Sequence, residues 1–152
     1  MEEWKMRLEK KVTPQVFYSK NMQEYFSKKH AILLNDYKVP EGQGRDACTL
    51  IACEVAKIFL KEGKTPYIVK IKENEKRGGW VHNKILRPVL FGGRVTWRTH
   101  HVCCYNGIAY DPMLGEPVSL NEYTLKAFGE NIQVKMLIPE EQIKEFVLLS
   151  LD

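Results

Sequence analysis

The chain has 152 residues, of which 44% are hydrophobic and 28% charged, and its formal net charge at pH 7 is +4. This length predicts one well-packed domain over residues 1–152, and the composition is typical of globular proteins and not of disordered or fibrous ones. The lysines are scattered among acidic residues, so no basic patch indicates nucleic-acid binding. No membrane span is expected either, since no apolar run approaches about 18 residues.

The beginning of the sequence and its cysteines indicate a reducing compartment. The first residues, Met-Glu-Glu-Trp-Lys-Met-Arg, contain neither an apolar run nor a cleavage site, so no signal peptide is expected. Four cysteines, two of them adjacent at Cys103 and Cys104, do not fit a disulfide framework. We therefore expect a cytoplasmic protein, or one that is exported without a cleavable signal.

Helical patterns dominate the first third of the chain. A short amphipathic helix is predicted over residues 2–11, and a second helix begins at Thr13-Pro14 and carries an aromatic stripe to about Lys29. The apolar run Ala31 to Leu34 predicts a short strand or a loop. Asn35 to Arg45, which is rich in glycine and contains a proline, predicts a loop.

After this loop the sequence predicts a buried helix that ends at Gly63. Asp46 is the expected N-cap and Gly63 the expected C-terminal cap. Cys48 would then lie in the first turn, where unpaired N–H groups and the helix dipole favour a thiolate over a thiol. Cys48 is therefore a candidate nucleophile, although a free cysteine at such a position is equally often a small core residue. The helical spacing rests on Ile51, Val55, Ile58 and Phe59.

The second half of the chain begins with predicted strands. Pro66 to Lys72 alternates as a strand does, and Glu73 to Gly79 predicts a flexible loop. Arg94 to Tyr105 predicts another strand. Asn106-Gly107 is the strongest hairpin signal in the sequence and returns the chain through Ile108 to Tyr110.

The C-terminal part predicts two more helices and a strand. Ser119 to Glu122 matches a capping box that opens a helix to about Phe128, and Ile132 to Ile138 predicts a strand. Pro139 begins a last helix. The whole pattern predicts an α+β domain in which N-terminal helices pack on an antiparallel β-sheet. The inner face of the last helix is predicted to carry Ile143, Phe146, Val147 and Leu149.

A nucleophilic thiolate needs a base, and the base needs an orienting partner. His100 and His101 lie on the first strand of the predicted hairpin, and Asp111 follows its second strand. A two-residue turn would place Asp111 on the same face as His100, whereas a three-residue loop would place His101 opposite Asp111. The residues alone leave both registers open.

These residues resemble a known superfamily. Gln43, then Asp46-Ala47-Cys48 opening a helix, then His101-Val102 heading a strand and Tyr110-Asp111-Pro112 after the next one are similar to the papain-like fold of cysteine peptidases, transglutaminases and protein deamidases. The resemblance covers roughly Gln43 to Pro112. Two features depart from the family pattern, namely Thr49 directly after the cysteine and the short separation of histidine and aspartate.

The resemblance implies a role for each matching residue. Cys48 would attack an acyl carbon, a histidine would accept and return the proton, and Asp111 would orient the imidazole. Gln43 and the backbone N–H of Cys48 would hold the oxyanion, at roughly 3 kcal/mol per donor. In these families an apolar residue usually follows the catalytic histidine, which favours His101 as the base, with His100 as the alternative.

The implied function is that of a thiol hydrolase that acts on an amide or related acyl bond of a protein or peptide. It would be a cysteine peptidase or a protein-glutamine deamidase. The alternative is a non-catalytic papain-like module that binds a protein partner. No cofactor is expected, and no metal, because the histidine and cysteine pairs of residues 100–104 lack the spacing of structural zinc sites. Cys53 points roughly 140° away from Cys48 on the helix and is predicted to be core.

Overall fold

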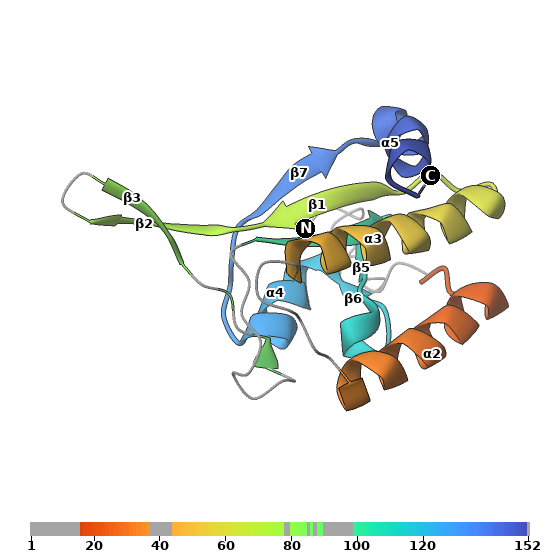
Figure 1. Ribbon diagram of the computed structural model, residues 1–152, viewed down its shortest axis with the longest axis horizontal. Coiled ribbons are helices and arrows are strands. Elements are labelled where there is room, and N and C mark those ends of the chain that lie inside the picture. Colours follow the sequence, from red (N-terminus) through yellow and green to blue (C-terminus); the bar gives the residue numbers. More distant parts are fainter. Residues whose placement is uncertain are drawn as a thin grey trace, which may run out of the picture.

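The computed structural model describes residues 16–36, 44–77, 80–84, 86, 88–89 and 99–151. The helix predicted over residues 2–11, the Thr13-Pro14 start and Gln43 lie outside these ranges. The described chain is a mixed α and β structure with a five-stranded antiparallel sheet in the order β6-β5-β4-β1-β7 (Figure 1). The predicted α+β class is therefore confirmed. Among the described helices, none has the length and apolar character that crossing a bilayer requires.

The first described helix is α2 (Lys20–Asp36), which starts and ends later than predicted. Ser19 is its N-cap, because the Ser19 hydroxyl accepts a hydrogen bond of 3.2 Å from the Met22 amide. The helix continues through Ala31 to Leu34, so the strand or loop predicted there is wrong. Within that run, Leu33 continues the buried side of α2 formed by Met22 and Phe26, whereas Ile32 is 56% exposed.

The central helix α3 spans Gly44–Lys61. Asp46 is its third residue and not its N-cap, which corrects the prediction, and Cys48 is its fifth residue. The predicted C-terminal cap is confirmed. Gly63 has a φ of 76°, its amide donates to Leu60 O, and the next amide donates to Phe59 O at 2.9 Å. These two bonds form a Schellman motif, in which glycine avoids the strain of a left-handed residue.

The sheet is built from strands that the sequence predicts in part. The strand β1 (Tyr67–Ile71) lies between the middle strand β4 (His100–Tyr105) and the edge strand β7 (Val134–Ile138), and both pairings are antiparallel. Beyond β4 come β5 (Ile108–Tyr110) and the short edge strand β6 (Val118–Ser119). The strand predicted over Pro66 to Lys72 is thus confirmed as β1, one residue shorter at each end.

A separate two-stranded ribbon leaves the body of the domain directly after β1. It consists of β2 (Glu73–Arg77) and β3 (Trp80–Lys84), paired from Glu73↔Lys84 to Arg77↔Trp80. Figure 1 shows it extending away from the five-stranded sheet. The flexible loop predicted over Glu73 to Gly79 is therefore wrong for its first five residues, which form a strand.

The β4–β5 hairpin has the register that a two-residue turn requires. Tyr105 pairs with Ile108, and Cys103 pairs with Tyr110. Asn106 and Gly107 have φ angles of 52° and 77°, so both residues are left-handed, as in a type I′ turn. This geometry settles the choice that the sequence left open, because it places Asp111 on the same face of the hairpin as His100.

The sheet has one buried cluster on each face. Cys103 and Tyr110 belong to the cluster that includes residues of α2, α3 and α5 (Ile143–Leu151). Cys104 and Ala109 belong to the second cluster, which includes residues of α4 (Leu120–Phe128). Figure 1 shows α3 running between α5 and α2. The helical N-terminal half thus packs on the sheet as predicted.

The last two helices follow the predicted order with local differences. Ser119 precedes α4 as its N-cap but makes no side-chain capping bond, so the predicted capping box is not formed on that side. A short 3₁₀ turn, η3 (Glu140–Gln142), precedes α5. Ile143 and Val147 of α5 are buried, but Leu149 is 77% exposed, which corrects its predicted place on the inner face.

Candidate active site

A buried histidine and a buried carboxylate meet at the β4–β5 hairpin. His100 begins β4 and Asp111 directly follows β5, and they are 4% and 6% exposed. The Nε2 atom of His100 lies 3.0 Å from Oδ2 of Asp111. Because Nε2 is engaged by the carboxylate, Nδ1 is the ring nitrogen that can exchange a proton with another group.

Asp111 is fixed by two further donors. Its Oδ1 accepts a hydrogen bond of 2.9 Å from the Met113 amide, and Oδ2 accepts a second one from the Tyr123 hydroxyl. The Met113 bond also makes Asp111 the cap of the 3₁₀ turn η2 (Pro112–Leu114). Each buried carboxylate oxygen therefore has a donor, as a buried charge requires.

The turn that follows Asp111 is held in place from α2. The Nδ1 atom of His30 lies 3.0 Å from the carbonyl oxygen of Pro112. Gly115, which ends η2 with a φ of 82°, packs so closely on the His30 ring that an added Cβ would lie 3.2 Å from it. His30 therefore supports the backbone that carries Asp111.

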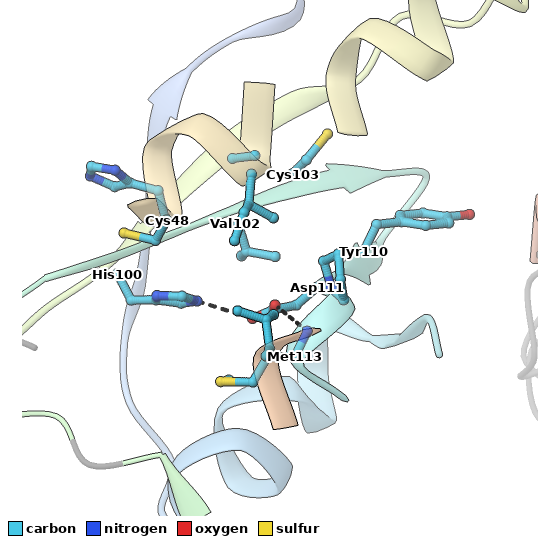
Figure 2. A pocket seen from close by; sticks show the side chains of 12 residues that line it. Cys48, His100, Val102, Cys103, Tyr110, Asp111 and Met113 are labelled. Carbon is cyan, nitrogen blue, oxygen red and sulfur yellow. Dashed lines mark hydrogen bonds and ion pairs between the residues drawn. The ribbon is translucent and has the colours of Figure 1, made fainter. Parts of the chain in front are cut away.

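Cys48 of α3 lines the same pocket as His100, His101 and Asp111 (Figure 2). The thiol is 3% exposed, and Leu33, Ile51 and Met113 form part of the apolar wall. The cavity measures about 10 Å³, close to the space of one water molecule. The space beside the thiol is therefore at the lower limit of what one water molecule needs.

The three groups shift one another's pKa values in the directions expected of a catalytic triad. Burial alone raises the pKa of the Cys48 thiol, but hydrogen bonds to His100 and His101 and the charge of His100 lower it to about 6. Burial lowers the pKa of His100, but the hydrogen bonds to Asp111 and Cys48 and their charges raise it to about 10. Burial raises the pKa of Asp111, which hydrogen bonds to His100 and Tyr123 bring below its ordinary value.

These shifts favour one ionisation state at neutral pH. With a thiol pKa of about 6 and an imidazole pKa of about 10, Cys48 is a thiolate and His100 an imidazolium between those values. The ionised Asp111 stabilises the imidazolium. The remaining cysteines differ, because burial raises the pKa of Cys53, Cys103 and Cys104. Cys48 is thus the cysteine whose surroundings activate it.

His101, the residue favoured as the base by the resemblance, does not meet Asp111. Its Nδ1 atom lies 2.8 Å from the hydroxyl oxygen of Thr49, and its side chain is half-buried. Successive residues of a strand point to opposite faces, and it is His100 that shares a face with Asp111. The preference for His101 is therefore wrong, and the alternative, His100, occupies the position between cysteine and aspartate.

The two predicted oxyanion donors have different outcomes. Gln43 lies outside the described residues, so its role stays a prediction. The first four amides of an α-helix lack an intrahelical acceptor. In a helix that begins at Gly44 these are residues 44–47, and the amide of Cys48 is the fifth. The prediction that this amide is free to bind an oxyanion is therefore not supported.

Tyr123 is the site residue that the sequence did not indicate. It lies on α4, is fully buried, and donates its hydroxyl to the same Asp111 oxygen that His100 contacts. Its position depends on how α4 packs against the sheet, which the local pattern of the chain does not encode. Within the described ranges, no cluster of three or more histidine, cysteine, aspartate or glutamate residues is arranged to hold a metal ion.

We compared the chain with protein-family models, with curated proteins and with solved structures, and none of the three comparisons gave a significant match.

Proposed function

We propose that the protein is a thiol hydrolase of papain-like type that cleaves an amide or related acyl bond through Cys48, His100 and Asp111. One observation carries the proposal: a single buried imidazole connects a carboxylate, at 3.0 Å from Nε2, with a cysteine whose thiol pKa it lowers. A cysteine, a base and an orienting acid in contact are the parts that covalent thiol catalysis needs.

The reaction would take place in two steps. The Cys48 thiolate attacks the acyl carbon, the bond to nitrogen breaks, and the proton on His100 Nδ1 passes to the leaving amine, which gives a thioester. Water then attacks the thioester while His100 takes its proton. The bond from carbon to sulfur breaks, and the acid is released with Cys48 again a thiolate.

Asp111 would act on the imidazole in both steps. Its carboxylate accepts the Nε2–H of His100, which keeps Nδ1 facing the thiol and stabilises the imidazolium. The cavity beside Cys48 has room for about one water molecule, which matches the nucleophile of the second step. A protein or peptide remains the proposed substrate class, and Gln43 remains the predicted oxyanion donor.

The proposal is tested by trapping the thioester. Incubation with p-nitrophenyl acetate should release nitrophenolate in a burst, and mass spectrometry of peptides should find acetyl on Cys48. The Cys48→Ala variant should show no burst, whereas Cys53→Ala should behave as the wild type, because Cys53 is a core residue of the same helix. Glutamine peptides then separate the two reactions, since a deamidase releases ammonia and a peptidase creates new chain ends.

Two negative results together would contradict the proposal. If no acetyl-enzyme forms, and if iodoacetamide at mildly acidic pH labels Cys48 no faster than the other three cysteines, the triad is not active. The protein would then fit a non-catalytic module that binds a protein partner.

A further inference from the structure

We propose that Tyr123 is the positioning residue of the Cys48–His100–Asp111 site, holding the Asp111 carboxylate in the orientation that His100 needs. The inference rests on the proposed function and extends the triad by a fourth residue. The inference starts from an oxygen atom that two side chains share. Oδ2 of Asp111 accepts one hydrogen bond from Nε2 of His100, at 3.0 Å, and a second one from the hydroxyl of Tyr123.

The carboxylate has little freedom once both bonds are made. The Met113 amide holds Oδ1 at 2.9 Å, so the Tyr123 bond fixes the second oxygen and with it the plane of the carboxylate. Without the hydroxyl, Oδ2 would be held by His100 alone. The Asp111 carboxylate could then rotate, and its hydrogen bond to Nε2 of His100 would be less directional. This bond is the one that keeps the proton on Nε2 of the imidazole.

Tyr123 is itself immobile. The side chain is fully buried, and its ring packs edge-to-face on Phe128 of the same helix, with ring centres 6.4 Å apart. Phe128 in turn packs edge-to-face on His100 at 5.8 Å. One helix, α4, therefore supplies the donor to Asp111 and an apolar contact for the imidazole, so it supports both members of the pair.

The surroundings of Tyr123 keep its phenol protonated, so that the hydroxyl can donate a hydrogen bond. Burial raises the pKa of its phenol, and the neighbouring Asp111, Cys104 and Cys48 raise it further, well above its ordinary value. The phenol thus keeps its proton at any pH at which the site operates, and Tyr123 does not exchange protons with the substrate. Its effect passes through Asp111 to His100.

The test compares two buried tyrosines that each lose only a hydroxyl. Tyr123→Phe removes the bond to Asp111, whereas the control Tyr110→Phe removes a bond of 2.5 Å to the carbonyl of Phe17. In Figure 2 the Tyr110 ring points away from Asp111 and His100. Both variants should lose stability in urea to a similar extent, because each removes one hydrogen bond of a buried tyrosine.

Only Tyr123→Phe should change the chemistry of Cys48. The pH midpoint of iodoacetamide alkylation at Cys48 should rise by about one pH unit in Tyr123→Phe, a tenfold loss of thiolate below the midpoint, and stay in place in Tyr110→Phe. Equal alkylation midpoints in the two variants would overturn the inference about Tyr123 but not the proposed function. An ordinary thiol midpoint already in the wild-type protein would overturn the proposed function as well, so the two failures can be told apart.

Discussion

Replacing each of the two adjacent histidines by glutamine separates the proposed base from its neighbour. In His100→Gln the amide can still donate to Asp111, so the buried carboxylate keeps a partner, but no imidazolium remains beside Cys48. His101→Gln is the matched control on the next residue. It removes the side chain that contacts Thr49 and makes the smaller side-chain contribution to the Cys48 pKa, and it leaves the His100–Asp111 pair intact.

The expected size of the His100→Gln effect follows from the pKa of the Cys48 thiol. The surroundings of Cys48 lower its pKa from 9.0 to about 6, which corresponds to about 4 kcal/mol of preference for the thiolate. Without His100, the burial and the hydrogen bonds to His101 remain, so the pKa of Cys48 should rise toward 9. If the pKa reaches 9, the thiolate fraction at pH 6 falls by roughly 500-fold. A more basic thiolate is more nucleophilic, so alkylation should slow by roughly 10- to 100-fold.

The assay is the rate of iodoacetamide alkylation at Cys48 from about pH 5 to about pH 9, read by peptide mass spectrometry. The midpoint should lie near 6 in the wild type and in the upper part of the range or beyond it for His100→Gln. For His101→Gln it should move by less than about one unit, because the bonds to His100 persist. Near-UV circular dichroism confirms that both variants are folded. If His101→Gln loses the low midpoint and His100→Gln keeps it, the assignment of the base is refuted.

Three further predictions concern the surroundings of the site. Gly107→Ala should destabilise the protein in urea by about 1–2 kcal/mol, because φ is 77° there while no atom blocks an added Cβ; an unchanged midpoint would contradict the type I′ turn. Thr49→Val removes the hydrogen bond to His101, so it should cost about 1 kcal/mol and leave the alkylation midpoint of Cys48 unchanged within about half a unit. Wild-type stability should vary little from about pH 6.5 to about pH 9, since in the folded state His100 holds the proton that Cys48 has lost. In Cys48→Ser only the raised pKa of His100 remains, so stability, measured as the free energy of unfolding in urea, should fall as pH rises through that range; a flat profile would argue against the ion pair.

The hairpin shows how far the sequence determines the site and where it stops. Asn106-Gly107 predicts the turn correctly, because few residue pairs accept two left-handed conformations. The sequence left the register open, since a three-residue loop also uses a left-handed glycine. The family pattern then favoured His101 wrongly, and the parity of the pleat assigns His100 to Asp111.

Other differences come from tertiary packing that a local pattern does not contain. The polar segment Glu73 to Arg77 was predicted as a loop because it lacks apolar alternation, yet its strand pairs with β3 in a ribbon outside the main sheet. The Gly-Gly pair after it was in fact a two-residue hairpin signal. Tyr123 joins the site only because α4 folds back over the hairpin, and no spacing along the chain relates it to Asp111.

The tight hairpin also sets an order of assembly. His100 and Asp111 are only 11 residues apart and meet when one turn closes, an event that takes microseconds in isolated hairpins. The helix that carries Cys48 has to dock across a much longer span, as the 52-residue separation of Thr49 and His101 shows. A nascent or partly unfolded chain should therefore contain an ordinary Cys48 thiol, and the lowered pKa of this thiol should arise only after α3 has docked on the hairpin.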